Sequence, residues 1–258
     1  MKKINQVLIS GYGSDDRKRA CRVEVNRGIE SMEIRRLSLL EGARRAKGTT
    51  VIIDVFRAFT TAAFVIANGA ETIIPVGTIE EAFELRRCNP GWLIMGEVHG
   101  HKVQGFDYGN SPDEVSQVDF TGKTVIQRTS SGVQGILTAS GADEVLLGSF
   151  VTAEATIDYI MRKKPSVVSL VAMGWEGEYE AMEDELCAEY LENRLRGKRL
   201  DFPEMVNKIR TDQQGMKFFD PTQTTFKEGD FYAAMSLDRF HFALKVKCWV
   251  PMRVEKIR

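Results

Sequence analysis

The chain has 258 residues, which is within the range of one α/β domain, and its 43% apolar and 28% charged residues allow a sizeable core under a charged surface. Its 35 Lys and Arg residues nearly balance 36 Asp and Glu residues, for a net charge of −1, which argues against nucleic acid as the main partner because binding to a phosphate backbone usually requires a basic excess. No apolar run approaches the roughly 20 residues that span a bilayer, so no membrane partner is expected.

The N-terminal residues and the cysteines indicate the compartment. Residues 1–6 are basic, but no apolar segment follows them, so the pattern of a signal peptide is missing and a cytoplasmic location is expected. Four scattered cysteines without a CxxC pair favour buried thiols in a reducing compartment. Because the first 31 residues are polar and aperiodic, we expect an N-terminal extension over 1–31 and a single domain over 32–258, and Met32 could even be the physiological start.

From residue 50 onward, short apolar runs rich in β-branched residues alternate with amphipathic stretches. In chain order we expect a strand over 50–54, a helix over 58–67, a strand over 72–76, a helix over 79–87, strands over 92–95 and 124–127, a helix over 133–140, a strand over 144–147, a helix over 153–163, a strand over 167–172 and a helix over 180–196. Thr78 is the expected N-cap of the second helix, with Glu81 as its capping-box partner, and Gly197 ends the longest helix.

The pattern weakens after Pro203, where short helices and a last strand over 244–250, ended by Pro251, are expected. The earlier strands are continuous apolar runs, which is typical of strands that are buried on both faces. Their alternation with helices predicts an α/β fold in which a largely parallel sheet is covered on both sides. The sequence leaves the order of the strands open.

Polar residues gather just after the predicted strands. In a parallel sheet the ligand binds beyond the carboxyl ends of the strands, so these positions are the candidates for a functional site. They include carboxylates, an arginine, hydroxyls, an amide and a glycine, namely Asp54, Arg57, Glu97, Asp107, Asn110, Ser111, Ser130, Ser131, Gly174, Glu183 and Asp184.

Asp54 ends the most apolar of the predicted strands. A carboxylate is costly to bury unless it is paired, hydrogen-bonded or bound to a metal. We therefore expect Asp54 to be a metal ligand or its immediate partner and not a structural cap. The alternatives are an N-cap of the following helix and a partner for Arg57.

Three other segments allow both a structural and a functional interpretation. Ser130 and Ser131 precede a predicted helix, where hydroxyls and free backbone N–H groups suit a phosphate, but a serine there can also be an ordinary N-cap. Glu183 and Asp184 open the longest predicted helix, where acids complement the helix dipole, yet Glu183 shares a face with apolar side chains. The loop over 105–112 is aperiodic and follows a strand, which favours a role in a site over a simple turn.

Several generic motifs are missing. The sequence has no GxxxxGK[ST] phosphate loop, no GxSxG nucleophile elbow and no dinucleotide-binding fingerprint after a buried strand. Its three histidines are too few and too poorly spaced for a zinc site, and none is expected to act as a general acid. A reaction that depends on carboxylates and a metal is therefore the expected chemistry.

Several sequence blocks together resemble the 2-phosphosulfolactate phosphatase family. The two most specific blocks are 51–61 (VIIDVFRAFTT) and 105–112 (GFDYGNSP). Weaker blocks lie at 41–46, 67–70, 96–97, 148–150, 172–174, 183–188 and 237–240. The resemblance runs in consistent order over about residues 32–250.

The resemblance implies a fold and an activity. The family consists of Mg²⁺-dependent phosphatases that release phosphate from 2-phosphosulfolactate, a step toward coenzyme M or sulfolactate. Its fold is a three-layer α/β/α sandwich with a largely parallel or mixed central sheet. The family often has Thr-Asn-Gly-Thr where this chain has Ser-Ser-Gly-Val at 130–133, a difference that bears on the substrate more than on the reaction class.

Site roles follow from this resemblance and from the chemistry of phosphoester hydrolysis. The expected catalytic residues are Asp54, Arg57 and Glu97. The expected substrate-binding residues are Arg57, Asn110, Ser111, Ser130, Ser131 and Gly174. The expected pool of Mg²⁺ ligands consists of Asp54, Asp107, Glu183 and Asp184.

Two of these residues have more specific expected roles. Arg57 would bind the phosphate with two parallel hydrogen bonds, and Glu97 would be either a further metal ligand or the general base. The substrate would be a small anionic phosphoester, and a homo-oligomer is left open. The alternatives are a phosphatase for another phosphorylated hydroxy acid and a non-catalytic protein that binds a phosphorylated metabolite.

Overall fold

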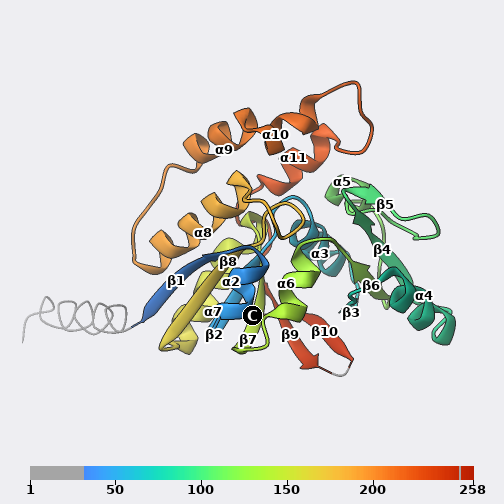
Figure 1. The fold of residues 1–258 in the computed structure, drawn as a ribbon, viewed down its shortest axis with the longest axis horizontal. Helices are drawn as coiled ribbons and strands as arrows, with labels where there is room; N and C mark the ends of the chain where they lie inside the picture. Colours follow the sequence, from blue (N-terminus) through green and yellow to red (C-terminus); the bar gives the residue numbers. More distant parts are fainter. Residues whose placement is uncertain (1–31, 250) are drawn as a thin grey trace, which may run out of the picture.

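The structure is a computed structural model that describes residues 32–249 and 251–258, so the expected extension over 1–31 lies outside it. Figure 1 shows the chain coloured from its N-terminus to its C-terminus. Its elements are β1 (Glu33–Ser38), α2 (Leu39–Arg45), β2 (Gly48–Ile53), α3 (Ala58–Ala67), β3 (Thr72–Pro75), α4 (Ile79–Cys88), β4 (Leu93–Val98), β5 (His101–Lys102), α5 (Pro112–Val115), β6 (Thr124–Arg128), α6 (Gly132–Thr138), β7 (Ala142–Gly148), the 3₁₀ helix η1 (Phe150–Thr152), α7 (Ala153–Lys163), β8 (Val167–Ala172), α8 (Met182–Leu195), α9 (Phe202–Thr211), α10 (Gln213–Met216), the 3₁₀ helix η2 (Lys217–Phe219), α11 (Glu228–Ala234), β9 (Ala243–Trp249) and β10 (Met252–Ile257).

The strands form one sheet in the order β1-β8-β2-β7-β9-β10-β3-β6-β4-β5. Strands β1, β8, β2 and β7 are parallel to one another, and so are β3, β6 and β4. The C-terminal hairpin of β9 and β10 lies between these two parallel blocks, antiparallel to β7 on one side and to β3 on the other. The sheet is therefore mixed, with mostly parallel pairs.

Alternate side chains of β2 pack against different helices. Ile52 belongs to a core with residues of α2, α3 and α6, whereas Val51 and Ile53 belong to a second core with residues of α7 and α8. Since successive side chains of a strand point to opposite faces, helices cover both faces of this part of the sheet. The expected three-layer α/β/α architecture is confirmed.

Most of the predicted elements are present with small differences at their ends. Helices α3 and α7 and strand β8 have the predicted bounds. The hydroxyl of Thr78 accepts the N–H of Glu81 at 3.1 Å, as predicted for the N-cap of α4. The carboxylate of Glu81 instead accepts the N–H of Gly77, one residue before the position that a capping box requires.

Several elements of the structure were not predicted from the sequence, among them β1, α2 and β10. In β10 only Val254 is buried, and Arg253, Glu255 and Lys256 are charged. The strand therefore lacks the apolar run by which the other strands were predicted. Pro251 was expected to end the last strand of the chain, but it lies in the turn between β9 and β10.

The C-terminal helices α9, α10 and α11 lie together at one end of the molecule, above α8 in Figure 1. They bring residues from the weakly patterned end of the sequence next to those that follow β2. Asp230 on α11 pairs with Arg57, and the ring of Phe226 lies 4.8 Å from the guanidinium carbon of Arg57. None of the described helices is long and apolar enough to span a membrane.

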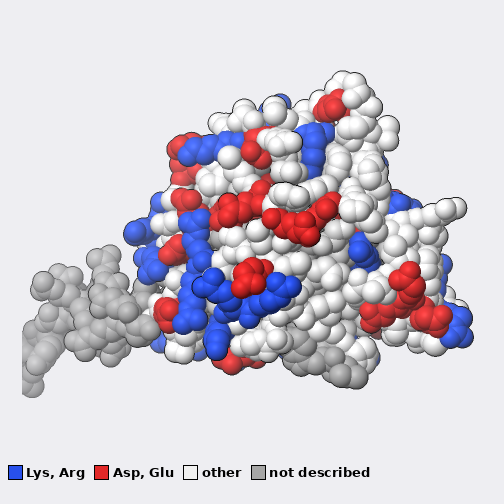
Figure 2. Space-filling view, in the orientation of Figure 1, with Lys and Arg blue, Asp and Glu red and all other residues white. Residues whose placement is uncertain are grey.

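Charges of both signs are interspersed on the surface shown in Figure 2. Basic side chains gather over the region of α2 and β1, and acidic side chains form a band between this region and the C-terminal helices. No field of a single sign covers this face of the molecule.

Candidate active site

Residues at the carboxyl ends of β2, β4, β6 and β8 line one pocket. Residues from the loops before α5 and α11 complete the lining. The pocket brings together seven of the residues expected from the sequence, namely Asp54, Arg57, Glu97, Asn110, Ser130, Ser131 and Gly174.

Asp54 directly follows β2 and is buried. Its Oδ1 accepts the N–H of Ala58 at 2.9 Å, which caps the start of α3, and its Oδ2 accepts the N–H of Gly132 at 2.9 Å, at the start of α6. Position 132 needs glycine because a Cβ there would lie 2.8 Å from Oδ2 of Asp54. Asp54 thus makes the structural hydrogen bonds that the alternative interpretation expects, Arg57 is not its hydrogen-bond partner, and its role as a metal ligand stays a prediction.

Glu97, near the end of β4, is buried as well. Its Oε1 accepts the N–H of Ser130 and its Oε2 accepts the N–H of Gly100, both at 2.6 Å. The backbone N–H groups of Ser130 and Gly132 are thus bound to carboxylates and are not free for a phosphate, contrary to the expectation from the sequence. The hydroxyl of Ser131 does not cap α6 and lines the pocket.

Glu183 and Asp184 lie in the first turn of α8 and are both buried. Asp184 accepts the N–H of Val55 at 2.7 Å and that of Gly174 at 2.9 Å, so it ties the end of β2 to the end of β8. Gly174 has a φ of +64°, and a Cβ at this position would lie 2.1 Å from the carbonyl oxygen of Tyr179. The Oε2 of Glu183 is buried and has no hydrogen-bond partner within the described part of the chain.

These buried carboxylates repel one another. The pKa of Asp54 is raised to about 6, chiefly by burial and also by the negative charge of Glu97. The hydrogen bonds from the N–H groups of Ala58 and Gly132 lower this pKa but do not cancel the effect of burial. Burial likewise raises the pKa of Glu183 to about 7. Burial raises the pKa of Asp184 well above its usual range, and the charges of Glu183 and Asp54 add to the effect. A bound cation would relieve this repulsion.

The side chains near the pocket could supply only part of a metal site. Among residues 32–249 and 251–258, no three His, Cys, Asp or Glu side chains are arranged so that they could hold a metal ion. Oxygen ligands of the kind that Mg²⁺ prefers are present, and one oxygen of Glu183 has no hydrogen-bond partner in the part of the chain that the structure describes. Since Mg²⁺ commonly binds one or two carboxylates together with substrate phosphates and water, the residues fit a site that is shared with the substrate. They do not fit a cage that the protein builds alone.

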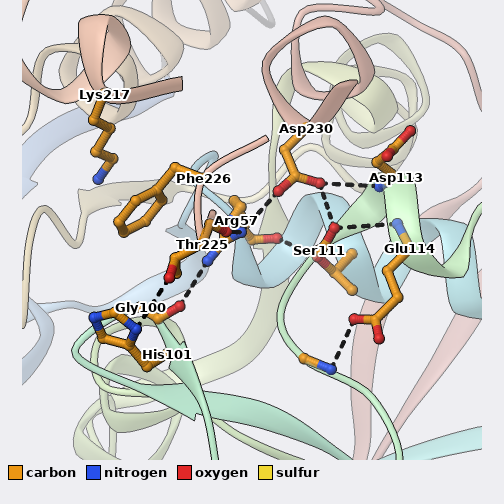
Figure 3. Close-up of polar contacts among 12 residues, drawn as sticks. Arg57, Gly100, His101, Ser111, Asp113, Glu114, Lys217, Thr225, Phe226 and Asp230 are labelled. Atoms are coloured by element: carbon orange, nitrogen blue, oxygen red, sulfur yellow. Dashed lines mark hydrogen bonds and ion pairs between the residues drawn. The ribbon is translucent and has the colours of Figure 1, made fainter. Parts of the chain in front are cut away.

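Arg57 is buried and held by the C-terminal part of the chain (Figure 3). Its Nη1 donates to Oδ2 of Asp230 at 2.7 Å and to the carbonyl oxygen of Thr225 at 2.9 Å, and its Nη2 donates to the carbonyl oxygen of Gly100 at 2.9 Å. These contacts use three of the five N–H groups of a guanidinium. At most two N–H groups are left for a phosphate. The main role of Arg57 in the fold is to hold α11 in place through its ion pair with Asp230.

Comparison with known protein families decides the assignment. The model of the family described as 2-phosphosulpholactate phosphatase matches residues 36–226. The chain belongs to the 2-phosphosulfolactate phosphatase family. The resemblance of the sequence blocks is thereby confirmed, and membership of this family makes the chain a phosphoric monoester hydrolase.

Three relatives of this phosphatase family show the extent of the similarity, and each is named a probable 2-phosphosulfolactate phosphatase. The chain is 32% identical to the protein of Bacillus subtilis (strain 168) over 200 residues, which are 76% of this chain and 86% of the relative. It is 40% identical to that of Caldicellulosiruptor saccharolyticus over 144 residues, 54% of this chain and 59% of the relative. It is 38% identical to that of Thermotoga petrophila over 148 residues, 57% of this chain and 63% of the relative. The matches to the last two relatives thus span about three fifths of their lengths.

Two residues of the GFDYGNSP block of the phosphatase family do not line the pocket. The carboxylate of Asp107 pairs with Arg86 on α4 and accepts the N–H of Ile94 at 2.8 Å. The hydroxyl of Ser111 caps α5 and donates to Oδ1 of Asp230 at 2.6 Å. The structure therefore uses Asp107, an expected metal ligand, and Ser111, an expected substrate group, to hold the loop in place.

The phosphatase pocket also contains residues that the sequence analysis missed. The Nδ1 of His99, from the turn after β4, contacts Oε1 of Glu176, from the loop after β8. Both residues have positive φ angles, 49° and 58°, which are uncommon outside glycine and often occur at functional sites. His99 lines the pocket, against the expectation that no histidine is well placed. His99 and Glu176 both follow predicted strands, so the rule that site residues lie beyond strand ends could have identified them. Phe226 lies in a part of the sequence without a clear pattern, so no such signal was available for it.

Proposed function

We propose that this chain hydrolyses 2-phosphosulfolactate to sulfolactate and inorganic phosphate with the help of Mg²⁺, as a step toward sulfolactate or coenzyme M. The family assignment and the names of the relatives support the substrate. The observation that carries the proposal is the group of buried carboxylates Asp54, Glu183 and Asp184 beside the pocket. Burial raises the pKa values of these carboxylates, a bound cation would offset that effect, and hydrolysis of a phosphoester dianion is helped by a cation as well.

Asp54 and Glu183 are the residues that would hold the ion, together with phosphoryl oxygens of the substrate and water. When bound, Mg²⁺ would neutralise charge on the phosphoryl oxygens and polarise the attacking water. Glu183 is suited to this role because its buried Oε2 has no hydrogen-bond partner among the described residues. Asp107 is left out of the proposed ligand set because its carboxylate pairs with Arg86.

Neutral groups would orient the phosphoryl group in the pocket. The hydroxyl of Ser131 lines the pocket without capping a helix. Asn110 lines it too, and its side-chain NH₂ group would donate to a phosphoryl oxygen. The hydroxyl of Ser130 is bonded to Glu97 at 3.3 Å and would act mainly by positioning that carboxylate. The remaining N–H groups of Arg57 would add a charged donor.

The reaction needs one proton acceptor and one proton donor. Water forms a bond to phosphorus and loses a proton, for which the carboxylates of Glu97 and Asp54 lie in the pocket wall. The bond between phosphorus and the oxygen of the hydroxy acid breaks, and this oxygen must gain a proton. His99, which contacts Glu176 and lines the pocket, would donate that proton.

Phosphate release from a panel of phosphorylated 2-hydroxy acids tests the proposal. The panel contains 2-phosphosulfolactate, 2-phospholactate and 2-phosphoglycerate, each assayed with Mg²⁺, with EDTA, and with EDTA followed by excess Mg²⁺. We expect the highest kcat/KM with 2-phosphosulfolactate, loss of turnover in EDTA and recovery with Mg²⁺. A higher kcat/KM with another acid would change the substrate, full activity without metal would contradict the role of Mg²⁺, and binding without turnover would favour a non-catalytic protein.

A further inference from the structure

Lys217, the first residue of η2, contacts two aromatic side chains that line the pocket and has no part in the mechanism above. Its Nζ lies 4.3 Å from the ring centroid of Trp175 and 4.3 Å from that of Phe226. Both of these rings line the pocket. Figure 3 shows the side chain of Lys217 pointing toward Phe226. The ammonium group is therefore held between two aromatic rings at the pocket wall.

The ammonium group has more donors than partners. It carries three N–H groups, and among the residues that the structure describes only Oε1 of Gln214 accepts one of them, at 2.6 Å. The faces of Trp175 and Phe226 attract the positive charge but do not replace hydrogen-bond acceptors. Two N–H groups of Lys217 thus remain for a ligand.

The charges around the pocket show that this group belongs to the site. Burial lowers the pKa of Lys217 to about 8, Glu183 opposes this effect and Arg57 adds to it, while Asp54 and Glu97 also favour the charged form. A simple structural ion pair would place a carboxylate on the ammonium. Instead, Oε2 of the buried Glu183 makes no hydrogen bond to any described residue.

The substrate of the proposed function carries more negative charge than the phosphoryl group alone. Its carbon skeleton bears a carboxylate and a sulfonate, and each of them needs donors or a cation when it leaves water. Arg57 donates three of its N–H groups to Asp230, Thr225 and Gly100, so it cannot bind all of these acidic groups. Lys217 lies on a different element from the carboxylates, and the rings beside it can cover the apolar part of the skeleton and exclude water.

We propose that Lys217, with Trp175 and Phe226, forms a second anion subsite that binds an acidic group on the carbon skeleton of the substrate, while the phosphoryl group occupies the part of the pocket lined by carboxylates. This inference rests on the proposed phosphatase function and adds the origin of its specificity. An ammonium can bind a carboxylate or a sulfonate, so the subsite selects phosphoesters of hydroxy acids over phosphoesters of uncharged alcohols.

The test combines one substitution with four phosphoesters. Lys217→Met keeps a long flexible side chain that packs well against aromatic rings, and it removes the charge and the N–H groups. The esters are 2-phosphosulfolactate, 2-phospholactate without the sulfonate, the phosphate ester of isethionate without the carboxylate, and ethyl phosphate without either group. Lys208→Met serves as the matched control, because Lys208 is exposed on α9 and pairs only with Glu204.

The subsite predicts a selective loss. For every ester that carries the recognised group, kcat/KM of Lys217→Met should fall about 10- to 100-fold, mostly through KM, as expected for one lost charge-assisted hydrogen bond. Ethyl phosphate should be hydrolysed at the wild-type kcat/KM, and the ester that still loses activity identifies the recognised group as sulfonate or carboxylate. Equal losses for all four esters would overturn the subsite, since Lys217 would then bind the phosphoryl group. No loss for any ester would overturn it as well.

A binding measurement separates this inference from the proposed function. Titration calorimetry with sulfolactate, the dephosphorylated acid, needs no turnover. Weaker binding of sulfolactate to Lys217→Met than to the wild type and to Lys208→Met would support the subsite even if no ester were hydrolysed, and the phosphatase proposal alone would then fail. Equal binding to all three proteins would overturn the subsite whatever the turnover.

Discussion

Asp54 holds two helix starts in place and, in the proposed function, would also bind the metal ion. Its two oxygens accept backbone N–H groups of Ala58 and Gly132, which hold the starts of α3 and α6 in place. Burial and the charge of Glu97 nevertheless raise its pKa from 3.8 to about 6. This shift corresponds to about 3 kcal/mol of unfavourable free energy for the ionised form. A cation in the pocket would recover part of this free energy.

Asp54→Asn separates the two roles. The substitution removes the charge, but it also sets an amide NH₂ against the N–H of Ala58 or Gly132, and each of these opposing effects is worth about 1–3 kcal/mol. We therefore expect the Tm without metal to change by only a few degrees, the rise of Tm on adding Mg²⁺ to disappear, and kcat to fall about 10³-fold. Thermal melts with EDTA or Mg²⁺ and a phosphate-release assay check this, with the exposed Asp143→Asn as control. A variant that Mg²⁺ stabilises like the wild type would exclude Asp54 as a ligand.

Glu183 predicts how stability depends on pH. Its pKa rises from 4.5 to about 7 on folding, so the folded state holds this proton more tightly than the unfolded state does. Its contribution to stability is therefore fully present below pH 4.5 and is lost as the pH rises toward and through 7, by up to about 3 kcal/mol.

Glu183→Gln tests this dependence because the amide has no proton to lose. In EDTA, the Tm of the variant should exceed that of the wild type at pH 8 and not at pH 4.5. Thermal melts at pH 4.5, 6, 7 and 8 measure the difference, and Glu180→Gln, an exposed position just before α8, is the control. A difference in Tm that stays constant over this range would show that the charge of Glu183 is not penalised in the fold.

His99 is tested through the leaving group. A general acid contributes about 10²- to 10⁴-fold when the departing oxygen is a poor leaving group, and it contributes little when that oxygen leaves as a stable anion. We expect His99→Gln to lower kcat about 10²-fold or more with 2-phosphosulfolactate, but by about threefold or less with p-nitrophenyl phosphate. His241→Gln, at an exposed position, is the control. Equal losses with both esters would mean that His99 does not donate the proton.

At the scale of elements, Asp230 joins α11 to two segments that precede it by more than a hundred residues. Its Oδ2 accepts from Arg57, and its Oδ1 accepts from the hydroxyl of Ser111 and from the N–H of Asp113. Arg57 and Asp230 are both buried. Buried ion pairs of this kind add little net stability but are costly to break, because removal of one partner leaves the other charge unpaired.

Asp230→Asn should therefore destabilise the protein by about 3–5 kcal/mol. We expect a large fall of Tm, and partial recovery when Arg57→Met is added, because the second substitution removes the unpaired charge. Asp220→Asn is the matched control, since its carboxylate bonds only to Thr222 among the described residues. A Tm of Asp230→Asn equal to that of the control would show that α11 does not depend on this pair.

At the scale of the whole molecule, the hairpin of β9 and β10 decides how the two parallel blocks meet. Because β10 is antiparallel to β3, the blocks run in opposite directions along the sheet. Strands β2 and β4 lie six positions apart in the sheet order, and neighbouring strands twist by about 20–25°. An average twist of this size accumulates to roughly 120–150° over six positions, which accounts for residues at the carboxyl ends of both blocks lining the same pocket.

The start of the described chain yields a prediction for truncation. Strand β1 begins at Glu33 and pairs with β8 along its whole length, and Met32 is part of the core. A protein that starts at Met32 should keep its Tm within about 2 °C and its full kcat, whereas one that starts at Leu39 loses β1 and should be unstable. Thermal melts and phosphate release measure both variants. Insolubility of the first variant would show that residues 1–31 contribute to the fold.

The sequence by itself determined the class of the fold and most elements between residues 50 and 196. Continuous apolar runs mark the strands that are buried on both faces, and the periodic pattern and end signals mark helices such as α3 and α7. The same local logic placed Asp54, Glu97 and Ser131 at strand ends, where the pocket forms. β1 and β10 escaped this logic because their side chains are largely exposed or only partly buried.

Only the tertiary structure decided which partners the polar groups take. The backbone N–H groups that seemed ready for a phosphate are bound to Glu97 and Asp54, and Arg57 pairs with Asp230 across 173 positions of the chain. Lys217 comes from a segment without a clear pattern and still packs its ammonium group against two rings that line the pocket. Local patterns encode burial and periodicity, but a hydrogen bond or ion pair depends on which groups approach within about 3 Å after the chain has packed. That approach is a property of the folded molecule as a whole.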